Sequence, residues 1–96
     1  MHYRITKVFH KAGKRTEITD HLQNMDDRIK AINGLQSVHL VAVSETESIG
    51  ISVYENEQQI IEAEQQFKEI MAGMMPLMTA APEITTAAVF WKYPKD

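Results

Sequence analysis

Residues 38–43 read Val-His-Leu-Val-Ala-Val, an apolar run in which only His39 is polar. In an extended strand, neighbouring side chains point to opposite faces of the sheet. Both faces of this strand are therefore apolar, with Val38, Leu40 and Ala42 on one face and Val41 and Val43 on the other. A strand of this kind predicts a sheet that is covered on both sides.

The residues that follow this run predict the second half of a β-hairpin. Residues 44–48 are polar and form the expected turn. Ile49, Ile51 and Val53 then alternate with smaller or more polar residues, which is the pattern of a strand.

The two ends of the chain also have strand patterns. Near the N-terminus, three apolar residues alternate with Arg4, Thr6 and His10, which predicts a half-buried strand. Its apolar face carries Tyr3, Ile5 and Phe9. Residues 85–93 are rich in β-branched and aromatic side chains and predict the last strand, with Trp91 and Tyr93 on the same face.

The first of two predicted helices lies between residues 18 and 32. Its apolar side chains recur at alternating spacings of four and three, which places them on one stripe of a helix. They are Ile18, Leu22, Met25, Ile29 and Ile32. Asn33 and Gly34 tolerate the left-handed backbone that commonly ends a helix.

The second predicted helix begins after Asn56. The side chain of Asn56 is suited to capping the free N–H groups, and Gln59 occupies the matching position of a capping box. The apolar stripe consists of Ile60, Ala63, Phe67, Ile70 and Met74. Pro76 or Pro82 is expected to kink or end the helix before the last strand.

The order of elements is βαββαβ, the ferredoxin-like arrangement. We therefore predict one α+β domain over residues 1–96, with a four-stranded antiparallel sheet and two helices on one face. The other face would leave about five or six apolar side chains in water, a larger patch than soluble monomers usually tolerate. We expect two copies to form a homodimer, sheet against sheet, as a dimeric α+β barrel. The alternative is that loops or the methionine-rich segment cover this face.

Composition narrows the range of partners. Ten basic and thirteen acidic residues give a net charge of -3, and the signs are interspersed, which argues against binding nucleic acid. The chain contains no cysteine, so it has neither disulfides nor thiolate metal ligands. The first ten residues lack the apolar stretch of a signal peptide or membrane span. These features predict a cytoplasmic protein with no membrane partner.

Several segments, in this order, resemble the antibiotic biosynthesis monooxygenase family of dimeric α+β barrels. Lys11-Ala12-Gly13-Lys14 before a helix and Asn33-Gly34-Leu35 before a strand resemble the turns of that family. Val53-Tyr54-Glu55-Asn56-Glu57-Gln58 resembles its passage from strand to capped helix, although tryptophan is more usual where Tyr54 stands. Met75-Pro76-Leu77 before the final strand is also similar.

The resemblance implies a dimeric barrel and suggests a class of reaction. The family includes oxygenases that act on electron-rich aromatic compounds without metal or flavin, relatives that degrade haem, and members with no known activity. The haem-degrading relatives use an asparagine on the first strand and a histidine on the second helical region, and this chain has neither. We therefore expect no haem and no other cofactor.

The candidate site residues are histidines and aromatic residues. His39 interrupts an apolar strand and is a candidate general base, with a hydrogen-bonded core or interface histidine as the alternative. Candidates for binding a substrate ring are Trp91, Tyr54, His10 and Phe67, each of which is also compatible with an ordinary structural role. The histidines are scattered and no Gly-rich phosphate loop is present, so neither a metal site nor a nucleotide site is expected.

The methionines near the second helix admit two interpretations. Met71, Met74, Met75 and Met78 either shape a pocket or contribute to a dimer contact. The leading functional hypothesis is a cofactor-independent monooxygenase that oxidises a small aromatic or hydrophobic compound in a pocket between sheet and helices. The alternative is a non-catalytic dimeric module that binds a hydrophobic metabolite or serves assembly.

Overall fold

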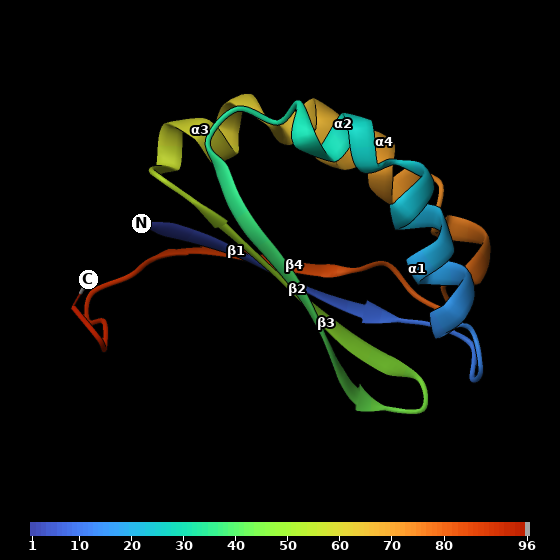
Figure 1. Cartoon of the computed structure of the whole chain (residues 1–96). Helices are drawn as coiled ribbons and strands as arrows, with labels where there is room; N and C mark the ends of the chain where they lie inside the picture. The colour runs from blue at the N-terminus through green and yellow to red at the C-terminus, as the bar shows by residue number, and fades with distance from the viewer. Residues whose placement is uncertain (96) are drawn as a thin grey trace.

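The structure, a computed structural model, describes residues 1–95 as a four-stranded sheet with every helix on one face (Figure 1). The strands are β1 (His2–Phe9), β2 (Leu35–Ser44), β3 (Glu47–Tyr54) and β4 (Glu83–Ala88). They lie in the order β2-β3-β1-β4, and each neighbouring pair is antiparallel. The predicted ferredoxin-like βαββαβ fold is confirmed.

Each predicted helix consists of two consecutive helices. The first pair is α1 (Arg15–Asn24) and α2 (Asp26–Lys30); the second is α3 (Glu57–Glu62) and α4 (Glu64–Ala72), followed by the 3-10 turn η1 (Met75–Leu77). The helical hydrogen bonding continues across both junctions, since Ile29 N donates to Met25 O at 2.9 Å and Phe67 N donates to Ala63 O at 2.9 Å. The apolar stripes therefore keep their direction, as predicted.

Strand β1 presents to the helices the face opposite to the one that its apolar pattern suggested. Arg4, Thr6, Val8 and His10 are buried beneath the helices. Tyr3, Ile5 and Phe9 lie on the far face, where they are only half-buried. Alternation along a strand separates its two faces but does not say which face a helix covers.

Strand β4 ends at Ala88 rather than at residue 93. Its last paired residue, Ala88, lies opposite His2, and Val89 N then donates to Met1 O at 3.1 Å. The pairing with β1 ends there, and the β-prone residues that follow continue as a tail (Figure 1). Trp91 and Tyr93 stack on each other in this tail, with ring centroids 6.4 Å apart, and both are exposed.

The face of the sheet away from the helices is uncovered (Figure 1). Ile51 in β3 lies between Ile5 of β1 and His39 of β2, so these three side chains form a row across this open face. Directly opposite residues of an antiparallel pair share a face. Within residues 1–95, no helix has both the length and the apolar character needed to cross a membrane.

One polar side chain links the start of α3 to the turn that follows α2. The Asn56 side chain accepts a hydrogen bond from Gln59 N at 3.1 Å, and the Gln59 side chain accepts one from Asn56 N at 3.3 Å. This is the predicted capping box. The same Gln59 side chain packs over Gly34, whose φ of 83° is in the left-handed region, and a Cβ at residue 34 would overlap it.

Replacing the cap tests the start of α3. We expect Asn56→Ala to lower the free energy of unfolding by about 1 kcal/mol, because the N–H of Gln59 loses its acceptor. Asn24→Ala is the matched control, since Asn24 is exposed at the end of α1. Urea unfolding followed by circular dichroism measures both. Equal losses for the two variants would contradict the capping role.

Candidate functional site

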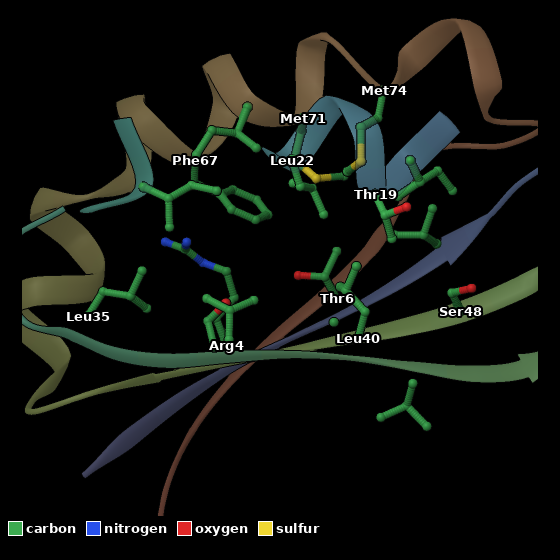
Figure 2. A pocket seen from close by; sticks show the side chains of 18 of the residues that line it. Arg4, Thr6, Thr19, Leu22, Leu35, Leu40, Ser48, Phe67, Met71 and Met74 are labelled. Atoms are coloured by element: carbon green, nitrogen blue, oxygen red, sulfur yellow. The ribbon is translucent and has the colours of Figure 1, made fainter. Parts of the chain in front are cut away.

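A cavity of about 220 Å³ lies between the sheet and the helices. Its floor is formed by β1, β2 and β3 and its roof by α1, α2 and α4, as Figure 2 shows for the labelled side chains. Val38 and Leu40 of the edge strand β2 line the cavity yet remain 45% and 46% exposed. The cavity therefore opens to the exterior along β2.

Arg4 projects from β1 into this mostly apolar space (Figure 2). Arg4 as a whole is only 3% exposed. Nη1 donates to the hydroxyl of Tyr54 at 3.1 Å, and Nη2 donates to the carbonyl of Ile60 at 3.2 Å. Ile60 lies in the last turn of α3, so the guanidinium ties β1 to this part of the helix.

Two aromatic rings enclose the Arg4 guanidinium. Its central carbon lies 4.0 Å from the centroid of Phe67 and 5.4 Å from the centroid of Tyr54. The negative faces of aromatic rings attract cations, most strongly where water is excluded. The ring contacts and the two hydrogen bonds hold the cation in one place, which is what a binding site requires.

No carboxylate balances this buried charge within the described residues. Three ion pairs occur among residues 1–95, Lys14–Glu17, Lys30–Asp26 and Lys68–Glu64, and none of them involves Arg4. The side chains that line the cavity include no Asp, Glu or His. An arginine stays charged in proteins, and a buried charge without an opposite partner is unfavourable.

A second guanidinium closes one end of the cavity. Arg15, at the start of α1, donates to the Ser48 hydroxyl at 3.0 Å and to the Glu47 carbonyl at 2.9 Å, and it also bonds the Ser44 carbonyl. These contacts fasten the first turn of α1 to the β2–β3 turn. Every one of these acceptors is neutral.

Two of the four methionines lie at the cavity, as one of the two interpretations predicts. Met71 and Met74 line the cavity, and their side chains point into it in Figure 2. Met75 is exposed on η1, whereas the backbone of Met78 bridges to His10. A flexible, polarizable wall made by Met71 and Met74 can adapt to ligands of different shape.

The structure brings together two of the five predicted site residues. Tyr54 and Phe67 both line the cavity beside Arg4. His39 lies opposite Ile51 on the open face, so the sheet separates it from the cavity. His39, the predicted general base, therefore does not contact this cavity.

His10 and Trp91 also lie outside the cavity lining. His10 is fully buried at the end of β1, with Nε2 2.9 Å from the Ser48 hydroxyl and Nδ1 3.0 Å from the Lys11 carbonyl. It is neither solvated nor at the cavity mouth. Trp91, in the exposed tail, borders a shallow hollow on the open face together with Tyr3 and Val53.

Arg4 is the site residue that sequence reasoning missed. Its charge and its position between apolar residues made it resemble the solvated side of a half-buried strand. A signal was nevertheless present, because Thr6, Val8 and His10 share its face and offer a mixture of small, apolar and titratable groups. A polar face on a strand predicted to be covered on both sides is a candidate cavity floor.

No protein-family model matches the sequence, and no curated protein matches it significantly. Among solved structures, SnoaB, a cofactor-independent oxygenase from Streptomyces nogalater studied as a mutant, has a TM-score of 0.77 at 13% identity, with 98% of each chain covered. A protein from Mycobacterium tuberculosis has a TM-score of 0.75 at 17% identity, covering 96% of this chain and 97% of its own.

A third similar structure bears the name of the family that the sequence segments resemble. It is a candidate antibiotic biosynthesis monooxygenase from Caulobacter crescentus, with a TM-score of 0.75 at 19% identity, covering 92% of this chain and 89% of its own. At these identities the likeness concerns the fold. The chain thus has the fold of the antibiotic biosynthesis monooxygenases, as its sequence segments indicated.

Proposed function

We propose that the protein is a cofactor-independent monooxygenase that acts on a small aromatic or hydrophobic compound bound in the cavity. The observation that carries this proposal is the cavity itself, an apolar space between sheet and helices that reaches the exterior along β2. The similarity between the fold of this chain and that of SnoaB, a cofactor-independent oxygenase, also supports the proposal. Enclosure from water favours oxygen chemistry because it protects reactive intermediates from side reactions.

The volume of the cavity limits the substrate. At about 220 Å³ it is somewhat larger than the ~150 Å³ engineered cavity that accommodates benzene. A compound with one aromatic ring and a few substituents fits this space, and the Phe67 ring offers a surface against which it can stack.

The proposed reaction needs only the substrate and molecular oxygen. An electron-rich phenol and O₂ give a quinone and water: one oxygen atom replaces a ring hydrogen as a carbonyl, and the other leaves as water. The substrate supplies all four electrons, so no bound redox group takes part. The residues of the chain bind the ring, orient it and exclude water.

We also propose that the working form is a homodimer joined through the open face. The apolar side chains of Ile5 and Ile51, which are neighbours on this face, would otherwise remain partly in water. The exposed aromatic tail borders the same face, and Trp91 with Tyr93 would extend the contact area. Mutual burial of two identical apolar faces is the simplest cover.

One observation favours the alternative, a non-catalytic module that binds a hydrophobic metabolite. None of the side chains that line the cavity is His, Asp or Glu, the common general bases. Substrates that ionise only with the help of a base would bind there without reacting. The two functions differ in whether oxygen is consumed.

Oxygen uptake with a panel that runs from one-ring hydroquinones to three-ring anthrones tests the proposal. We expect turnover, with preference for the smaller compounds. Met71→Trp should reduce the turnover rate per enzyme at least about 10-fold, because the indole would occupy the cavity. Met75→Trp is the matched control, because Met75 is exposed on η1 and should leave turnover unchanged. Oxygen consumption by none of the compounds would favour the binding module.

A further inference from the structure

We infer that the cavity binds a small aromatic anion whose negatively charged oxygen lies against Arg4. The inference rests on the proposed function, because it names the substrate class of the same cavity. The starting point is that Arg4 as a whole residue is only 3% exposed and that its guanidinium forms no ion pair within residues 1–95. A bound ligand can supply the negative charge that pairs with this guanidinium.

The protein contacts of Arg4 satisfy only part of its hydrogen-bonding capacity. A guanidinium has five N–H groups, and two of them donate, to Tyr54 and to the Ile60 carbonyl. Both acceptors are neutral, so neither balances the positive charge of the guanidinium. The remaining donors therefore suit a charged oxygen, to which hydrogen bonds are shorter and stronger.

The rest of the cavity fits the remainder of such a ligand. Thr6 lies on the same floor as Arg4, and its hydroxyl points into the space in Figure 2, where it can donate to the same oxygen. The roof above is apolar, with Leu22, Met71 and Met74. A ligand that is charged at one end and apolar at the other matches this division.

No lining group competes with an incoming anion. The second guanidinium of the cavity, Arg15, has only neutral acceptors and adds positive potential. The lining includes no Asp or Glu that would repel a negative charge. A carboxylate and a phenolate share the required charged oxygen, and a phenolate is also the electron-rich form that reacts with oxygen under the proposed function.

Calorimetric titration with benzoate and benzamide tests the inference without turnover, because the two differ in charge and hardly in shape. We expect the wild type to bind benzoate about 10 to 100 times more tightly, the range of a charge-assisted hydrogen bond. Arg4→Met should bring this ratio near one. Arg28→Met, which removes the same charge from an exposed position on α2, is the matched control and should retain the ratio.

A second pair of probes separates the two sources of charge. At a pH where 4-nitrophenol is ionised, it is compared with neutral 4-nitroanisole. A preference for benzoate assigns a carboxylate ligand, and a preference found only with the nitrophenolate assigns a phenolate. Equal binding in both pairs by the wild type would overturn the inference, as would a preference that Arg15→Met abolishes and Arg4→Met retains.

The remaining outcomes separate this inference from the proposed function. If Arg4→Met does not fold, Arg4→Lys keeps a cation without the planar set of donors and should lower the ratio without reversing it. Anion preference without oxygen uptake would leave the inference standing and remove the monooxygenase. If neutral compounds turn over and bind as tightly as anions, the monooxygenase proposal stands and the anion inference fails.

Discussion

Ile51→Glu is expected to convert the protein from a dimer into a folded monomer. Ile51 lies at the centre of the open face, between Ile5 and His39. A two-fold interface would bury the new carboxylate twice, once in each copy, at a cost of about 3 to 5 kcal/mol for each unpaired charge. The dissociation constant of the dimer should therefore rise by about 10⁴- to 10⁷-fold.

Sedimentation velocity at micromolar concentration measures this change. The wild type should sediment as two chains of 11.0 kDa and the variant as one, with unchanged helical circular dichroism. Ile61→Glu is the matched control, because Ile61 is an exposed isoleucine of α3 on the other side of the sheet. A folded wild-type monomer under these conditions would refute the sheet-to-sheet dimer.

Ile60→Ala is expected to lower the free energy of unfolding by about 2 to 5 kcal/mol. Ile60 is 5% exposed and packs in the core cluster with Tyr54 and Ile70. The loss combines the removed apolar contacts with the cavity that they leave. Such a loss is a large fraction of the stability of a small domain.

The neighbouring isoleucine supplies the control for this change. Ile61 is 55% exposed, so Ile61→Ala should cost less than about 0.5 kcal/mol. Chemical unfolding at one fixed protein concentration measures both variants, since dimerisation makes stability depend on concentration. Similar losses at the two positions would show that α3 is rotated relative to the sheet.

The arrangement of elements could be predicted from sequence because each depends on local spacing. The stripe from Ile18 to Ile32 and the capping pair Asn56 and Gln59 need only neighbours along the chain, and both are present. The end of β4 could not be predicted in this way. It depends on where β1 begins, at His2, and no property of residues 85–93 contains that information.

The candidate site was less accessible to sequence reasoning for a related physical reason. Tyr54 and Phe67 were identified as aromatic residues suited to a pocket, and both lie there. Arg4 was overlooked because a charge in an alternating strand normally marks the solvent side. Alternation along β1 does not show which of its faces the helices cover, and they cover the face that carries Arg4.

The contact between Gln59 and Gly34 means that two turns, 25 positions apart in the chain, depend on one side chain. Any larger residue at position 34 would displace the amide that completes the cap of α3. Such a residue requires either that the Gln59 side chain swings away or that a shorter residue replaces it, and both changes open the cap. Such epistasis predicts that relatives keep or lose glycine and glutamine here as a pair.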